Sequence, residues 1–146
     1  MAIVKANISH MDQIDELLDV WENEAGDDSI SYRSMETYIN GETVYLHIPE
    51  DEDIISGIMV VSDSYKYMDL SYLYVHPDYR GDGVGSELLE SLTELLDHKC
   101  MNAFLKVADN NEAQFLYERF GFIQSKTLKE EGFIDMERCY REELTC

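Results

Sequence analysis

Residues 72–86 constrain the fold of this chain more than any other stretch. Residues 73–75 are β-formers, and Pro77 ends their run because proline has no N–H to donate to a sheet. Three glycines follow within residues 81–85, where they let the backbone turn tightly and approach a ligand. An amphipathic run begins near Val84. The stretch therefore predicts a strand, a glycine-rich loop and a helix, in that order.

The loop predicts an anion site at the start of the helix. The first N–H groups of a helix have no partner within it, and the helix dipole favours negative charge there. A phosphate group fits such a position, and Arg80 adds a full positive charge. The spacing matches neither the Rossmann fingerprint G-x-G-x-x-G nor a Walker loop, which needs a Lys after its last glycine. An ordinary strand–helix connection is the simpler alternative.

The rest of the chain alternates short apolar strands with amphipathic helices. Strands are predicted at residues 2–6, 43–48, 54–61, 66–75, 101–107, 123–128 and 133–140. Helices are predicted from the N-cap Ser9, over residues 34–39, from Val84, and from Asn110 or Asn111 to a C-cap glycine at Gly121. Gly57, inside a strand, indicates a bulge or a close backbone approach.

These elements predict one α/β domain over residues 1–146. A strand–helix–strand crossover makes the strands at 66–75 and 101–107 parallel, whereas tight turns make the others antiparallel. The expected architecture is a mixed sheet of about seven strands, antiparallel at both ends, flanked by about four helices.

The chain is strongly acidic. Its 31 Asp and Glu residues outnumber 11 Lys and Arg residues, which gives a formal net charge of −20. Between Ala6 and Tyr65 the only Lys or Arg is Arg33. Such a surface repels nucleic-acid phosphates and anionic lipids, and it attracts a cationic substrate. A solvated acidic face without a ligand is the alternative.

No stretch predicts export or membrane insertion. No apolar run approaches the ~20 residues of a membrane-spanning helix, and the N-terminus lacks a basic segment followed by an apolar one. The cysteines, at positions 100, 139 and 146, are odd in number and widely spaced, and they predict no disulfide framework. A cytoplasmic protein without a metal site is therefore expected.

Two blocks of the sequence resemble the motifs of one family. Residues 75–85, V-H-P-D-Y-R-G-D-G-V-G, resemble motif A of the GNAT superfamily of acyl-CoA N-acyltransferases, [Q/R]-x-x-G-x-[G/A]. Residues 110–122, N-N-E-A-Q-F-L-Y-E-R-F-G-F, resemble its motif B, N-x-x-A-x-x-x-Y-x-x-x-G-F. Both blocks stand in the family's order and separation. The resemblance implies the GNAT fold, in which two parallel strands splay apart around the pantetheine arm of the cosubstrate.

The resemblance implies an acetyl-CoA site and a role for each matching residue. The positions expected to bind the cosubstrate are Leu73, Tyr74, Val75, Arg80, Gly81, Asp82, Gly83, Val84, Gly85, Ser86, Asn110, Ala113 and Tyr117. The backbone of Leu73 and Val75 would meet the pantetheine, and the loop would hold the pyrophosphate. Asn110, with Asn111 as a competitor, matches the motif asparagine. Tyr117 matches the tyrosine that protonates the departing thiolate, with a core aromatic as the alternative.

Two positions depart from the family pattern. Asp82 places an acid beside the expected pyrophosphate, where it costs affinity unless it points away or pairs with Arg80. Ser71 stands where many relatives carry a glutamate base, so Asp69, two residues back on the same strand face, is the expected catalytic base. The other candidates are Tyr65, Tyr72 and His76.

The favoured function is direct transfer of an acetyl group from acetyl-CoA to a primary amine through a ternary complex. The acceptor is expected to be a cationic small molecule or peptide. A non-catalytic CoA-binding module is one alternative. Acetylation of protein N-termini is another, disfavoured because Leu105 stands where enzymes acting on ribosomal proteins carry a glutamate. Neither nucleic acid nor a membrane is an expected partner, and the tyrosines near Tyr140 are compatible with a homodimer.

Overall fold

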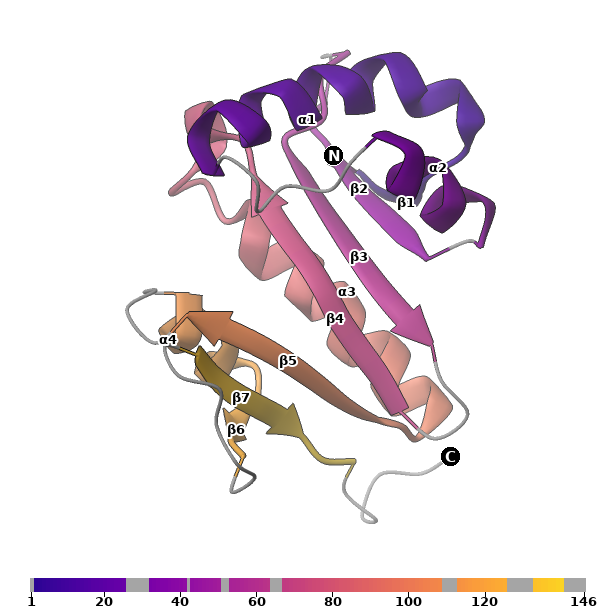
Figure 1. Cartoon of the computed structure of the whole chain (residues 1–146). Coiled ribbons are helices and arrows are strands. Elements are labelled where there is room, and N and C mark those ends of the chain that lie inside the picture. The colour runs from indigo at the N-terminus through magenta and orange to yellow at the C-terminus, as the bar shows by residue number, and fades with distance from the viewer. Residues whose placement is uncertain are drawn as a thin grey trace. The chain divides into compact units, whose positions relative to one another are not determined.

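The computed structural model of the chain describes residues 2–25, 32–41, 43–50, 53–63, 67–108, 113–125 and 133–140 (Figure 1). Its elements are β1 (Ala2–Lys5), the 3₁₀ turn η1 (Ile8–His10), α1 (Met11–Ala25), α2 (Tyr32–Asn40), β2 (Val44–Ile48), β3 (Gly57–Asp63), β4 (Tyr67–Val75), the 3₁₀ turn η3 (Pro77–Tyr79), α3 (Val84–Lys99), β5 (Asn102–Ala108), α4 (Ala113–Arg119), β6 (Ile123–Gln124) and β7 (Phe133–Arg138). Each predicted element has a counterpart, although β3 begins three residues later than the predicted strand at residue 54. Of the strand predicted at residues 123–128, only Ile123–Gln124 is a strand, and residues 126–128 fall outside the described residues.

The strands form a seven-stranded mixed sheet in the order β1-β2-β3-β4-β5-β7-β6. The pairs β1–β2, β2–β3, β5–β7 and β6–β7 are antiparallel. Strands β4 and β5 are parallel, with a register that runs from Tyr67 opposite Asn102 to Leu70 opposite Leu105. With the four α-helices of the described residues, this confirms the predicted α/β fold and its one parallel pair.

The chain forms two compact units, which share strands β3 and β4 and helix α3. The first unit contains Met1–Val60 and Tyr72–Leu88, and the second contains Val61–Ser71 and Leu89–Cys146. That residues 1–146 act as a single domain stays a prediction.

The first unit has its own core, in which the apolar stripe of α1 packs with α2 and the strands (Figure 1). The buried members of this core are Ala6, Met11, Ile14, Leu17, Leu18, Trp21, Met35, Ile39, Val44, Leu46, Ile55, Ile58, Val60 and Tyr74. Ser9 does not cap α1 as predicted. Asn7 caps the preceding turn η1 instead, because its Oδ1 accepts from the Ser9 N–H at 2.9 Å. The 3₁₀ turn therefore moves the cap two residues upstream.

Gly57 lies where the backbone of β3 meets the first two turns of α3. A Cβ at this position would lie 2.6 Å from Val84 Cγ1 and 3.0 Å from Leu88 Cδ1, and both side chains are buried. Only a residue without a side chain allows this contact. The close backbone approach predicted from the sequence is confirmed.

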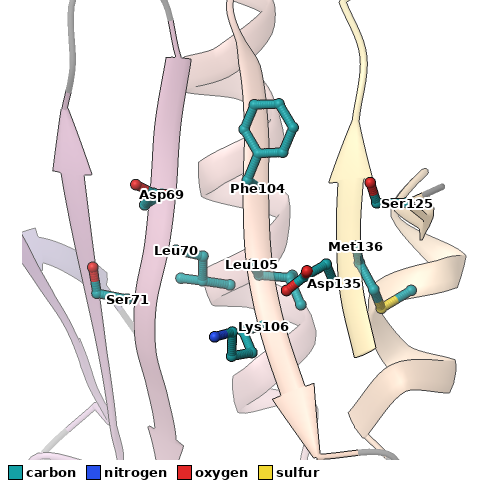
Figure 2. Close-up of a pocket in the computed structure, with 9 residues that line it drawn as sticks. All are labelled: Asp69, Leu70, Ser71, Phe104, Leu105, Lys106, Ser125, Asp135 and Met136. Carbon is teal, nitrogen blue, oxygen red and sulfur yellow. The ribbon is translucent and has the colours of Figure 1, made fainter. Parts of the chain in front are cut away.

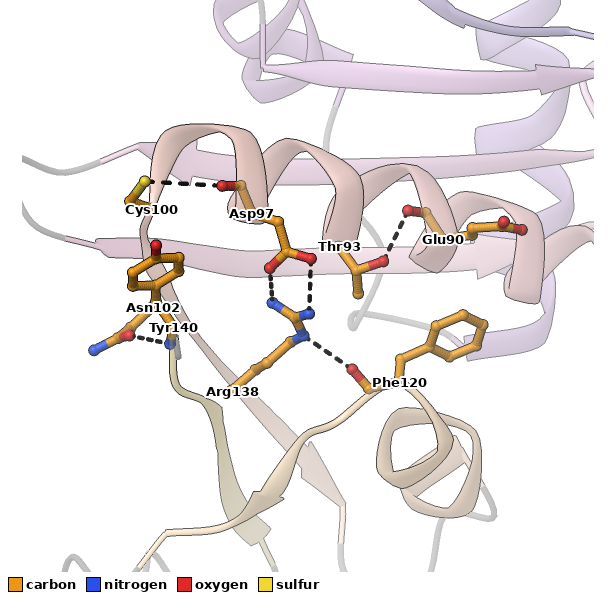
Figure 3. A network of polar contacts seen from close by, with 8 residues as sticks. All are labelled: Glu90, Thr93, Asp97, Cys100, Asn102, Phe120, Arg138 and Tyr140. Atoms are coloured by element: carbon orange, nitrogen blue, oxygen red, sulfur yellow. Dashed lines mark hydrogen bonds and ion pairs between the residues drawn. The ribbon is translucent and has the colours of Figure 1, made fainter. Parts of the chain in front are cut away.

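Arg138 links three elements of the second unit, as Figure 3 shows. Its Nη1 and Nη2 donate to the two carboxylate oxygens of Asp97 on α3, at 3.0 and 3.3 Å, and its Nε donates to the Phe120 carbonyl after α4, at 3.0 Å. Gly121 has φ = +94°, the left-handed conformation expected of a C-cap glycine. The end of α4 is thus attached to β7 and α3.

Two findings bear on the environment of the protein. Cys139 is a free, exposed thiol, and Cys146 falls outside the described residues. Over the described ranges, no helix is both long enough and apolar enough to cross a membrane. The cytoplasmic location stays a prediction.

Gly57→Ala is expected to lower the free energy of unfolding by about 1–3 kcal/mol, because the added Cβ overpacks Val84 and Leu88. Urea denaturation measures the change. Gly41→Ala is the matched control, since its nearest non-neighbouring atoms lie 3.6 Å from the added Cβ and the change there should stay within about 0.5 kcal/mol. Equal stability of the two variants would contradict the close approach.

Arg138→Met is expected to destabilise the protein by about 1–3 kcal/mol, because it removes a bidentate carboxylate pair and leaves the Phe120 carbonyl without this donor. Arg119→Met, at an exposed position of α4, removes the same charge without these contacts. Thermal and urea unfolding of both variants separate the two effects. The same loss in both would assign it to charge alone.

Candidate functional site

The glycine-rich loop lies in the first unit, between β4 and α3. His76 begins it by capping η3, with its Nδ1 accepting from the Asp78 N–H at 3.0 Å. Gly81 and Gly83 have φ values of +88° and +85°, and no atom lies within 4 Å of a Cβ built at either position. Backbone conformation, and not lack of space, requires glycine at both. Helix α3, 16 residues long, then begins at the buried Val84, so its N-terminal N–H groups and dipole favour an anion at this loop.

Arg80 is held by a carboxylate from α1. Its Nη1 donates to Glu24 Oε2 at 2.8 Å and its Nη2 donates to the other oxygen, which makes a bidentate pair. Its Nε donates to the Val75 carbonyl at 3.1 Å. A guanidinium carries five N–H groups, and these contacts engage three of them.

Two stacked aromatic residues, Tyr74 and Trp21, lie beside this ion pair. The Tyr74 hydroxyl donates to Glu24 Oε1 at 2.9 Å, and the Arg80 guanidinium lies 5.5 Å from the centre of the Tyr74 ring. The ring in turn stacks on Trp21, 4.7 Å between centroids. Hydrogen bonds from Arg80, and then from Tyr74, hold the pKa of Glu24 below its ordinary value. Burial, followed by the Glu24 contact, raises the pKa of Tyr74 to about 12.

Asp82, the acid that departs from the family pattern, is exposed. It does not pair with Arg80, whose carboxylate partner is Glu24. Asp82 was expected to avoid repelling an anion either by pairing with Arg80 or by pointing away. The structure does not use the first of these, the pairing with Arg80.

Tyr117 lies in the second unit, on α4. It is 8% exposed, and its ring meets Phe122 edge-on at 6.0 Å. Burial raises its pKa to about 12, so the phenol keeps its proton at neutral pH and is a weaker acid than a free tyrosine. Ala113 lies one turn earlier on the same face of the helix. The predicted Asn110 and its competitor Asn111 fall outside the described residues.

The second unit also contains a pocket of about 420 Å³ that includes the predicted base (Figure 2). The residues that line it are Asp69, Leu70, Ser71, Phe104, Leu105, Lys106, Ser125, Asp135 and Met136. Asp69 lies on β4 opposite Phe104 of β5, and burial raises the pKa of its carboxyl group. A raised pKa makes the carboxylate a stronger base, as proton abstraction requires.

The other candidate bases are less suitable. His76 already uses Nδ1 as the acceptor of the η3 cap, so protonation there would break the cap. Tyr72 packs edge-on against Trp21, 5.7 Å between ring centroids. Ser71, at the usual glutamate position, shares a hydrogen bond with the Ser62 hydroxyl at 2.9 Å. Tyr65 falls outside the described residues.

Sequence reasoning missed three residues next to the loop. Glu24 stands 56 residues from Arg80, and its position within a general run of acids gave no sign of a specific partner. His47 and Glu87, 40 residues apart, form a partly buried contact at the start of α3. No local spacing or motif marks either pair.

Comparison with known proteins identifies a matching family and two proteins of similar sequence. A family model of the acetyltransferase (GNAT) domain matches residues 12–138. The chain is 41% identical over 54 residues to thialysine N-epsilon-acetyltransferase from Bos taurus, a match over 36% of this chain and 32% of that protein. It is 33% identical over 69 residues to the cysteine-rich protein 2-binding protein of Homo sapiens, over 47% of this chain and 9% of that protein. The chain thus spans only a minor part of either relative.

Solved structures share the fold over nearly the whole chain. One is the PaiA N-acetyltransferase of Thermoplasma acidophilum, solved in complex with coenzyme A. It has a TM-score of 0.77 at 19% identity, and the match covers 95% of this chain and 98% of that one. The ribosomal-protein-S18-alanine N-acetyltransferase of Escherichia coli has a TM-score of 0.76 at 20% identity and covers 99% of both chains. At these identities the likeness shows the fold.

Glu24→Gln is expected to lower stability at neutral pH and to have no effect in acid. Because Arg80 lowers the folded-state pKa of Glu24, the stabilisation is present above the unfolded pKa and lost as the pH falls through the folded one. The Arg80 and Glu24 side chains are 47% and 40% exposed, so screening limits the effect to about 0.2–1 kcal/mol.

Urea unfolding of the wild type and the variant across the acid range measures the effect. The two curves should converge in acid. Glu22→Gln, exposed on the same helix, should show no such convergence. A difference that persists at every pH would contradict the role given to the ion pair.

Proposed function

Because the chain belongs to the GNAT acetyltransferase domain family, we propose that it transfers an acetyl group from acetyl-CoA to a primary amine. The observation that carries this proposal is the left-handed glycine loop at the start of α3, beside the Arg80 guanidinium that Glu24 and Val75 hold in place. A pyrophosphate suits such a site, because backbone N–H groups, the helix dipole and a fixed positive charge converge on it. The coenzyme A in the Thermoplasma acidophilum relative supports this choice of ligand.

The residues of this chain would bind the cosubstrate in two ways. The N–H groups of residues 81–86, together with Arg80, would hold the pyrophosphate. The backbone groups of Leu73 and Val75, at the end of β4, would hydrogen-bond the amide-rich pantetheine as a neighbouring strand would. Ala113 and the predicted Asn110 would complete the site.

The reaction needs two proton transfers, and each gives a role to one residue: a general base for the amine and a general acid for the departing thiolate. An amine with a pKa near ~10 arrives protonated and must lose that proton before it attacks. Asp69, a stronger base through its raised pKa, would take the proton directly or through a water. The thioester supplies an activated acyl carbon, where a C–N bond forms and the C–S bond breaks. Tyr117, which keeps its proton at neutral pH, would protonate the departing sulfur, and the second proton that the nitrogen loses as the amide forms would restore the phenol.

The acceptor we infer is a cationic amine. Exposed acids line α1, at positions Asp12, Glu16, Asp19 and Glu22. With the net charge of −20, they attract cations and repel polyanions. The bovine relative, named for acetylation of thialysine, also supports an amine acceptor, either a small molecule or a peptide.

Two measurements test the function. Calorimetry with acetyl-CoA should show binding well below millimolar concentration, and a thiol-release assay should show turnover with spermidine or a lysine-rich peptide. If acidic side chains steer the acceptor, the on-rate and kcat/KM should fall as salt rises. Absence of binding would overturn the proposal, and binding without turnover on any amine would leave a CoA-binding module.

Tyr117→Phe is expected to reduce kcat about 10²-fold or more and to leave the Kd of acetyl-CoA unchanged, because it removes only the proton donor. Steady-state kinetics and calorimetry measure the two effects. Tyr67→Phe, which removes a hydroxyl from a more exposed position of the same unit, is the control and should keep kcat. An unchanged kcat in Tyr117→Phe would assign Tyr117 to the core alone.

A further inference from the structure

A buried histidine of the first unit has no part in the chemistry proposed above. His47, on β2, is 4% exposed. Its Nδ1 lies 2.6 Å from the Ser56 hydroxyl, and its Nε2 is hydrogen-bonded to Glu87 Oε2. Glu87 belongs to the first turn of α3, the helix that begins at the glycine loop. The pair therefore involves the first turn of the helix that follows the expected anion site.

The same contacts hold both ends of the loop. At the upstream end, the His76 N–H donates to the Ser56 carbonyl at 2.8 Å. At the downstream end, the Glu87 carboxylate reaches His47, and the Glu87 N–H donates to the Gly83 carbonyl at 3.0 Å. Residues 77–86 are thus attached to β2 and to the residue before β3 at their two ends.

The directions of the hydrogen bonds determine the number of protons. The Ser56 hydroxyl has one proton and two partners, the His47 carbonyl at 2.9 Å, which can only accept, and His47 Nδ1 at 2.6 Å. When that proton goes to the carbonyl, the hydroxyl oxygen accepts from Nδ1, which then carries a hydrogen. A proton must also lie between Nε2 and Oε2, because two lone pairs cannot form this contact. In this arrangement the pair is either an imidazolium with a carboxylate or a neutral imidazole with a carboxylic acid, and in both cases its net charge is zero.

We propose that His47 and Glu87 share one proton, and that this pair positions the glycine loop and cancels the charge of Glu87 for binding of the CoA pyrophosphate. An uncompensated carboxylate in the first turn of α3 would repel the phosphates. The shared proton removes that repulsion and fixes the turn at the same time. The inference rests on the proposed function, since it takes CoA as the anion.

An acyl-transfer triad is the alternative use of a serine, a histidine and an acid. The geometry opposes it, because Ser56 is fully buried and so cannot reach a substrate carbonyl. His47 and Glu87 are therefore positioning residues.

Two substitutions of Glu87 separate positioning from simple electrostatics. In Glu87→Gln the amide can donate to Nε2 of a neutral His47, so the attachment survives without the shared proton. In Glu87→Ala the attachment is lost. Electrostatics alone predicts tighter CoA binding by both variants, since each removes a carboxylate. Positioning predicts that Glu87→Ala binds CoA about tenfold more weakly, while Glu87→Gln stays within about threefold of the wild type.

Calorimetry with CoA measures these affinities, and Glu94→Ala is the matched control. Glu94 is exposed on the same helix, so its loss removes the same charge without touching the loop. Binding by Glu87→Ala as tight as by Glu94→Ala, or tighter, would overturn the positioning role.

Two readouts do not depend on CoA. Nitrogen-15 NMR of the His47 ring at neutral pH should show a proton on Nδ1 and a second proton shared by Nε2, and only the Nδ1 proton in Glu87→Gln. Amide exchange over residues 77–86 should accelerate in Glu87→Ala and not in Glu94→Ala. If the wild type binds no CoA, the proposed function fails while these readouts still decide the inference. A ring without the second proton, or unchanged exchange, would refute it.

Discussion

The contact between the β3 backbone and the start of α3 determines where everything else in the first unit lies. Because Gly57 has no side chain, Val84 and Leu88 pack directly against the strand. That distance sets the first turn of α3 within reach of β2, so Glu87 can meet His47, and it brings His76 to the Ser56 carbonyl. The loop between them then has its conformation fixed by two left-handed glycines. The absence of a Cβ at Gly57 thus allows the packing on which both the polar contacts and the expected anion site depend.

The second constraint is electrostatic, because a chain of net charge −20 is expected to bind a polyanion. Around the loop, the structure neutralises acids one at a time. Glu24 is paired with Arg80 and with the Tyr74 hydroxyl, and Glu87 is paired with His47. The acids of α1 that face solvent carry no such compensation in the described contacts. Asp82, on the loop itself, is exposed and does not pair with Arg80, so the loop keeps an acid of its own within an acidic surface.

Local patterns were sufficient to predict most of the fold. Apolar periodicity marked the strands and helices, the crossover length implied the parallel pair, and glycine spacing identified the loop and the close approach at Gly57. The cap of the first helix was misplaced because an Asn7-capped 3₁₀ turn precedes it. The pairings of Glu24 with Arg80 and of His47 with Glu87 were not predictable, since tertiary packing alone joins residues 56 and 40 positions apart. For Asp69, the sequence suggested the residue, but only the structure showed the burial that raises its pKa.

The bidentate ion pair between Glu24 and Arg80 has a thermodynamic consequence for ligand binding. A free arginine side chain holds about 2 kcal/mol of rotamer entropy, which a ligand must overcome when it immobilises the guanidinium. Here three N–H groups are already engaged by Glu24 and Val75, so most of that ordering takes place when the chain folds. A ligand that binds Arg80 would therefore meet a side chain that is already ordered. Ligand binding at this loop should therefore depend on the direction of the Arg80 N–H groups as much as on their charge. Ordering the Arg80 side chain should add only a small entropic penalty to binding.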